Sequence, residues 1–162
     1  MTQFNLLNRY EFDDIENGYS FTTDDGNTYF VYFIEYPLID TLPDGTLFTF
    51  NIERLDDNNH RNGSEQKVRN TILHILASFF EKHERAILSV CDITDGRQKV
   101  RKRLFDKWYN DFGATLLEKR EAPVIVEGNI TYSMLYYRRD NIYKSLLEDG
   151  FDELVAVNFY NE

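Results

Sequence analysis

Four residues near the middle of the chain have the types and the spacing to bind an anion. They are Asp92, Gly96, Arg97 and Arg101, and they follow an apolar run over residues 86–91. The turn carries a helix N-cap pattern, and a helix that starts there points its unpaired N–H groups at a ligand. Gly96 allows close approach of that ligand, and two guanidinium groups form a fork for its oxygens. The pattern predicts a site for an anion or a phosphate-bearing ligand, with or without catalysis.

A structural reading of the same residues stays open. At about 100° per residue, Arg97 and Arg101 fall on one side of a helix predicted over residues 99–112. That side also carries the apolar residues of the helix, which are Val100, Leu104, Phe105, Trp108 and Phe112. A guanidinium group turned inward must meet a carboxylate, a carbonyl or an anion, because an unpaired buried charge is very costly. In this reading Asp92 pairs with Arg97, and Arg101 locks the helix to the sheet.

The remaining basic residues of that helix point away from its apolar side. They are Lys99, Lys102, Arg103 and Lys107, and together they predict an exposed basic helix face. The acidic residues are concentrated elsewhere, because residues 1–60 hold 12 acidic and 2 basic residues while residues 61–162 hold 16 of each. Such separation favours steered association with a charged protein or with a second copy of the chain. A net charge of −10 makes nucleic acid an unfavourable partner.

Composition excludes several classes of function. One cysteine and three histidines leave little for a metal site, and we expect neither a metal nor a cofactor. The phosphate-binding, dinucleotide-binding and nucleophile-elbow motifs are absent from the sequence. Lacking a signal segment and an apolar run of membrane-spanning length, the chain is expected in the cytoplasm. The best prediction is a non-enzymatic protein-interaction or regulatory module, and the anion site is the alternative.

Hydrophobic periodicity and turn residues predict an α+β fold. The expected sheet is antiparallel or mixed and contains a meander, a central strand and a hairpin, with strands near residues 19–22, 28–36, 46–55, 86–91, 115–118, 123–127 and 130–138. Two longer helices over residues 65–84 and 99–112 should pack on it. A short helix over residues 141–149 is expected to end at Gly150, before a last strand over residues 154–159. We expect one domain over residues 1–162, with residues 1–18 as a loosely packed acidic arm.

One stretch also carries a resemblance. Cys91-Asp92-x-x-Asp95-Gly96-Arg97-Gln98-x-x-Arg101-x-Arg103-Leu104-Phe105 resembles the signature of a family of small bacterial proteins of unknown function. The similarity extends from the strand at Tyr19 through the hairpin after Pro123. It implies one compact domain and adds no chemistry, so the candidate residues rest on their own types and spacing.

Overall fold

The fold was obtained as a computed structural model. It describes residues 8–36, 42–55, 65–90, 106–107, 109–113, 115–126 and 128–160. The helical elements among these residues include α1 (Glu65–Phe79), α3 (Lys144–Tyr160) and the π-helical turn η2 (Tyr109–Gly113). No helix among these residues is long and apolar enough to cross a membrane.

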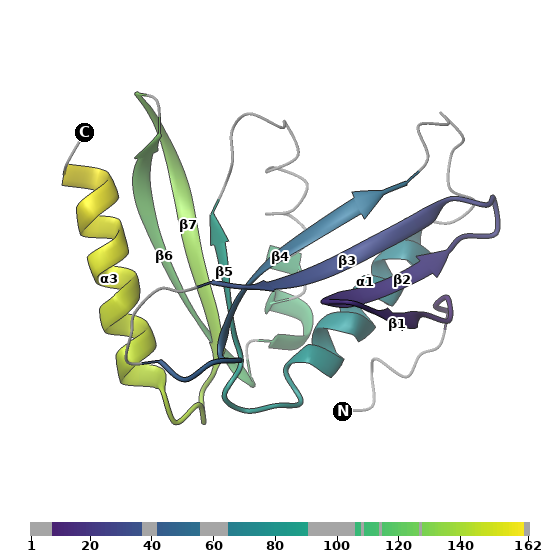
Figure 1. The fold of residues 1–162 in the computed structure, drawn as a ribbon, viewed down its shortest axis with the longest axis horizontal. Coiled ribbons are helices and arrows are strands. Elements are labelled where there is room, and N and C mark those ends of the chain that lie inside the picture. The colour runs from purple at the N-terminus through teal and green to yellow at the C-terminus, as the bar shows by residue number, and fades with distance from the viewer. Residues whose placement is uncertain are drawn as a thin grey trace. The chain divides into compact units, whose positions relative to one another are not determined.

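Seven strands form one mixed sheet (Figure 1). They are β1 (Asp13–Ile15), β2 (Gly18–Thr22), β3 (Thr28–Glu35), β4 (Leu47–Arg54), β5 (Ala86–Val90), β6 (Leu117–Val126) and β7 (Asn129–Arg138). Hydrogen bonding orders them β1-β2-β3-β4-β5-β7-β6. β4 and β5 run parallel, whereas β5 and β6 both run antiparallel to β7. The predicted α+β class is confirmed, and the sheet is of the mixed kind.

The chain divides into two compact units, and each is described by itself. The first contains residues 1–34 and 50–81, and the second contains residues 35–49 and 82–162. The expectation of a single domain over residues 1–162 stays a prediction.

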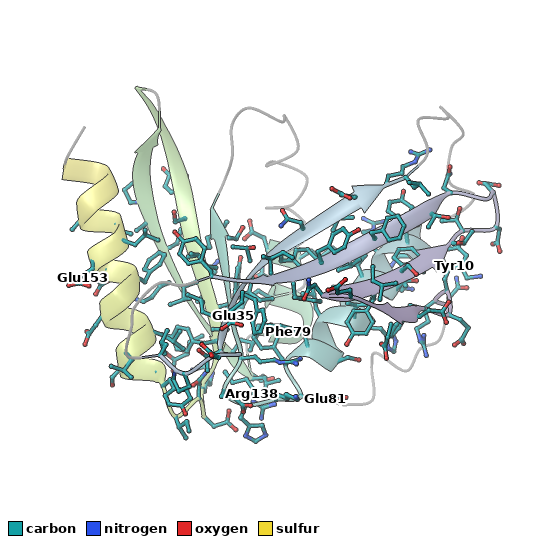
Figure 2. All side chains as sticks on the ribbon, in the orientation of Figure 1. Tyr10, Glu35, Phe79, Glu81, Arg138 and Glu153 are labelled. Atoms are coloured by element: carbon teal, nitrogen blue, oxygen red, sulfur yellow. The ribbon has the colours of Figure 1, made fainter. Side chains whose placement is uncertain are left out.

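The first unit packs α1 against one face of its strands. Phe79 of α1 stacks on Phe33 of β3 with the ring centroids 4.3 Å apart. At the other end of the unit, the backbone N–H of Tyr10 donates to the hydroxyl of Thr71, 2.9 Å away. Tyr10 and Phe79, labelled in Figure 2, are both buried. Because Tyr10 is buried and Asp13–Ile15 form β1, part of the predicted acidic arm belongs to a packed structure.

The second unit places α3 against β6 and β7. Its core joins residues from both the helix and the strands, namely Leu47, Ala86, Leu88, Leu135, Tyr137, Leu147 and Phe151. On the other face of these strands, the ring of Tyr109 in η2 lies 6.3 Å from the ring of Tyr136. Burial on both faces explains why β5 is apolar at every position except Ser89, as expected of a central strand.

Several expected boundaries were wrong. The strands predicted over residues 115–118 and 123–127 are one strand, β6. α3 does not end at Gly150 but continues to Tyr160, so the strand predicted over residues 154–159 is helical. Gly150 and Phe151 are both buried, and packing of the helix on the sheet outweighs the helix cost of a glycine, about 1 kcal/mol. α1 ends at Phe79, before the predicted end at residue 84, and the chain turns there to enter β5.

Candidate functional site

The residues of the predicted anion site lie outside the described part of the chain. This holds for Asp92, Gly96, Arg97 and Arg101, and equally for Lys99, Lys102 and Arg103 of the predicted basic face. Lys107 is the member of that face that the structure describes, and it is exposed at a helical position. The anion site and its structural alternative therefore both stay predictions.

The described residues present a different surface, on the face of the first unit turned away from α1. In the register of β2 and β3, Ser20 lies opposite Phe30 and Gly18 lies opposite Tyr32. Successive side chains of a strand point to opposite faces, so Phe30 and Tyr32 share one face while Val31 and Phe33 point to α1. Val31 is fully buried, whereas Phe30 and Tyr32 are half-buried. α1 lies behind β2 and β3 in Figure 1, and no described helix of this unit packs on the face with Phe30 and Tyr32.

The register of β4 adds one acidic and one amide side chain to this face. The backbone N–H of Leu55 donates to the carbonyl of Thr28, and Tyr36 and Leu47 make the corresponding bond at the other end of the two strands. Both bonds fit the same antiparallel pairing of β3 with β4, in which Leu55 lies opposite Thr28 and Leu47 lies opposite Tyr36. In that register Glu53 lies opposite Phe30, and Asn51 lies opposite Tyr32. Glu53 is exposed, and Asn51 is half-buried.

The edge strand β1 adds a second carboxylate in the same row. Asp13 lies opposite Ser20, and Ile15 lies opposite Gly18. The row across the strands is therefore Asp13, Ser20, Phe30 and Glu53, with a carboxylate at each end. Asp13, like Glu53, is exposed.

We name this surface the open face. It consists of Asp13, Ile15, Ser20, Phe30, Tyr32, Ile34, Asn51 and Glu53. The rings of Phe30 and Tyr32 stack along β3 with centroids 6.0 Å apart and planes 20° apart. Ile34 extends the apolar line and is 43% exposed. The open face thus combines a continuous apolar line on β3 with a carboxylate on β4 and another on β1.

Gly18 leaves the open face without a side chain beside Tyr32 on β2. A Cβ atom at this position would stand 1.9 Å from the carbonyl oxygen of Val31, so only glycine allows the backbones to approach in this way. Between Ile15 on β1 and Tyr32 on β3, this row therefore has no side chain from β2. The ring of Tyr32 is left without a neighbour on β2 of the same row.

A cation already meets a ring and a carboxylate elsewhere in this unit. The Lys67 ammonium lies 4.3 Å from the centroid of the Tyr10 ring and 3.7 Å from Asp24 Oδ2. Similarly, the guanidinium of Arg9 lies 5.1 Å from the centroid of the Phe12 ring. Aromatic rings attract cations through their electron-rich faces, most strongly where water is partly excluded. The first unit therefore uses ring–cation contact as part of its own structure.

The second unit contains a polar cluster between α3 and the sheet. The Tyr137 hydroxyl is placed between Glu148 of α3 and Glu118 of β6, and burial together with these carboxylates raises the pKa of Tyr137. Lys144 Nζ donates to Glu118 at 2.7 Å, and this bond is the main reason that the pKa of Glu118 is lowered. Arg120 binds both oxygens of Asp152 and also pairs with Glu148.

The cluster is a structural link. Each of its three carboxylates meets a cation of the same cluster, and the phenol is protonated and buried. These charge-assisted contacts fix the position of α3 on β6 and β7. Within the described ranges, no group of three or more histidine, cysteine, aspartate or glutamate side chains is arranged to hold a metal ion.

Comparison with known families gives one match. The family model that matches covers residues 64–153 and is described as a family of unknown function, DUF6169. This is more than half of the chain, so the chain belongs to DUF6169. The match contains the stretch that carried the resemblance, but it begins after β4, so the expected similarity from Tyr19 onward is not covered before residue 64. Neither the curated proteins nor the solved structures gave a match.

The open face was missed in the sequence although a signal for it was present. β3 has the sequence Thr-Tyr-Phe-Val-Tyr-Phe-Ile-Glu, which is apolar or aromatic on both faces. An antiparallel strand covered by a helix on one side needs apolar residues on that side only. The second apolar face of β3 therefore indicated either a second covering layer or an exposed binding surface.

Proposed function

We propose that this chain is a non-enzymatic protein-interaction module and that it binds its partner through the open face. The observation that carries the proposal is the line of Phe30, Tyr32 and Ile34 on a sheet face that no described helix of the unit covers. Contiguous exposed apolar surface is typical of interaction sites, and tyrosine and phenylalanine are enriched at the centres of such sites. Both aromatic side chains sit on a strand, so little conformational entropy is lost when a partner binds.

The surroundings of the line support the same proposal. Polar side chains lie on both sides of the rings, with Asp13 and Ser20 toward one edge and Asn51 and Glu53 on β4. An apolar centre with a polar rim is the usual anatomy of a protein interface. The flat surface of a sheet also suits a macromolecule better than a small molecule, because small ligands are normally enclosed.

The experiment compares capture by three forms of the chain from a lysate of the source organism. The first is the wild type, and the second carries Phe30→Ser and Tyr32→Ser. The third is a matched control with Ile142→Ser and Leu146→Ser, because Ile142 is 80% exposed and Leu146 is also exposed, both in the second unit. Circular dichroism and the melting temperature establish that all three are folded.

The proposal predicts a partner that the wild type and the control retain and that the Phe30/Tyr32 variant loses. The same selectivity must then appear when the retained protein is purified and titrated with each form. Equal capture by all three forms contradicts the proposal.

A second candidate function rests on the sequence pattern of the charged turn. In this alternative, Arg97 and Arg101 bind an anion or a phosphate-bearing ligand beside Asp92, with Gly96 allowing its approach. A native-state ligand raises the melting temperature. The alternative predicts that phosphate or a nucleotide raises it in the wild type and not in Arg101→Gln. A panel of phosphates without effect on the wild type contradicts the alternative.

A further inference from the structure

We propose that the partner presents a basic segment to the open face, with an arginine or lysine side chain lying over the rings of Phe30 and Tyr32. This inference rests on the proposed function and names the chemistry of the partner. The cation would lie between the carboxylates of Asp13 and Glu53. Three observations support it, and each concerns described residues of the first unit.

The first observation is the pair of stacked rings. Phe30 and Tyr32 are two residues apart on the same face of β3, and their rings stack with centroids 6.0 Å and planes 20° apart, so the pair presents an aromatic surface in which both rings have a similar orientation. The guanidinium group of arginine is planar and weakly hydrated, and it stacks well on such a surface. A purely apolar partner would gain less from the electron-rich faces of the two rings than a flat cation does.

The second observation is the position of the carboxylates. Glu53 is on the strand next to Phe30, and Asp13 is two strands away on the other side. Because neighbouring strands are about 4.8 Å apart, Glu53 is one strand spacing from Phe30 and Asp13 is two spacings away, so the two carboxylates flank a basic segment that crosses the ring. Both are exposed, so they are available to a partner. Residues 1–60, with 12 acidic and 2 basic residues, add long-range attraction for a basic segment.

The third observation is the contact that Lys67 makes within the same unit. Its ammonium lies against the ring of Tyr10 and near the carboxylate of Asp24. The open face offers the same two groups, a ring and a carboxylate, to a cation from outside. The interaction is thus of a kind that this unit already forms.

Nucleic acid is the competing occupant, since bases also stack on aromatic side chains. The carboxylates argue against it, because Asp13 and Glu53 would face the phosphates of a strand that crosses the same rings. The two occupants respond oppositely to neutralisation of these carboxylates. Removing the charges should weaken the binding of a basic segment and strengthen the binding of a nucleic acid.

The test is a titration with a fluorescently labelled peptide of alternating glycine and arginine. A second peptide has citrulline in place of every arginine, which keeps the shape and removes the charge. The protein is the full chain in three variant forms and the wild type. The ring variant carries Phe30→Leu and Tyr32→Leu, which keep apolar bulk and remove the π faces. The carboxylate variant carries Asp13→Asn and Glu53→Gln.

The control variant changes the net charge by the same amount away from the open face. It carries Asp14→Asn and Asp25→Asn, because Asp14 lies opposite Tyr19 on the other face and Asp25 is in the hairpin turn. Both side chains are exposed. General attraction between an acidic protein and a basic peptide affects the control and the carboxylate variant equally. Site-specific binding affects the carboxylate variant alone.

The inference predicts that the arginine peptide binds the wild type and the control, and that the citrulline peptide does not. The ring variant and the carboxylate variant should each raise Kd by about fivefold to tenfold. Equal weakening of the control and the carboxylate variant overturns the inference, as does equal binding of the two peptides. A labelled oligonucleotide that binds more tightly to the carboxylate variant than to the control also overturns it.

Failure of this inference can be told apart from failure of the proposed function. If the variant with Phe30→Ser and Tyr32→Ser loses the captured partner and no arginine-dependent binding is found, the proposal of a basic segment is wrong. The proposal of an interaction module then stands. If capture is the same for every form, the proposed function is wrong and the inference falls with it. If either double variant of Phe30 and Tyr32 is unfolded, the single variant Tyr32→Leu replaces it in that measurement.

Discussion

Tyr137 of β7 donates its hydroxyl hydrogen to the carboxylate of Glu148 on α3, from a position that is 1% exposed. The same hydroxyl oxygen is 3.2 Å from Glu118 Oε2 on β6. One phenol therefore joins the helix to two strands of the second unit. The ion pairs of Lys144 and Arg120 neutralise the two carboxylates that it meets.

Replacing Tyr137 with phenylalanine should destabilise the second unit. The variant keeps the buried ring and removes a hydrogen bond to a charged group, which costs about 1.5–3 kcal/mol of the free energy of unfolding. Chemical denaturation measures this loss. Tyr132→Phe is the matched control on the same strand, because Tyr132 is 43% exposed and its change should have little effect. Equal stability of the two variants contradicts the structural role of the Tyr137 hydroxyl.

The Lys144–Glu118 pair should make stability depend on acid pH. Because Lys144 lowers the pKa of Glu118 in the folded state below its ordinary value of 4.5, the unfolded chain takes up the proton first. The contribution of the pair is complete above pH 4.5 and is lost as the pH falls through the folded-state pKa. Urea denaturation at about pH 7 and about pH 3 should show a smaller acid loss for Lys144→Gln than for the wild type. An identical acid loss in the two proteins contradicts this assignment.

His74 should cause a separate loss of stability on acidification, in a higher pH range than the Lys144–Glu118 pair. Burial, together with the charge of Arg9, lowers the pKa of His74 from its ordinary value of 6.5. The unfolded chain therefore binds more protons below pH 6.5, and stability falls as the pH decreases through that value. His74→Gln cannot be protonated, so its melting temperature should fall less between about pH 7.5 and about pH 5.5. Parallel profiles for the two proteins contradict the prediction.

Gly18→Ala should be far more damaging than other glycine changes. The added Cβ would stand 1.9 Å from the backbone oxygen of Val31, and only separation of the strands relieves the clash. We expect a loss of more than about 2 kcal/mol. Gly26→Asn is the comparison, because Gly26 has a φ of 84° and open space around it, and asparagine tolerates that conformation. Its effect should be below about 1 kcal/mol, and a similar loss in both variants contradicts the account of Gly18.

Local signals in the sequence were sufficient for most strands of the sheet. The turn at residues 24–27 and the alternation on both sides of it correspond to the hairpin of β2 and β3. The apolar run after residue 85 corresponds to β5. The same kind of signal failed at Gly150, because a glycine ends a helix only where tertiary packing does not extend it. The apolar residues after Leu154 suit a helix or a strand equally well. In the structure they are helical, and Leu154 and Val155 pack against the core of the second unit.

The candidate site was less accessible to sequence reasoning. Phe30 and Tyr32 were expected in a strand, but alternation alone does not tell which of two apolar faces is covered. The row that joins Asp13 to Glu53 depends on registers across three strand pairs, and these residues are 40 positions apart. The charged turn of Asp92 and Arg97 was recognised from its sequence, and it lies outside the described residues.

The most direct measurement is a map of backbone amide chemical shifts during titration of the wild type with the glycine–arginine peptide. The open face predicts shifts concentrated at Asp13, Ser20, Phe30, Tyr32 and Glu53, which decrease as salt is added. The citrulline peptide should leave these amides unchanged. Shifts centred on α3 or β5, or spread evenly over all acidic residues, contradict binding of a basic segment at the open face.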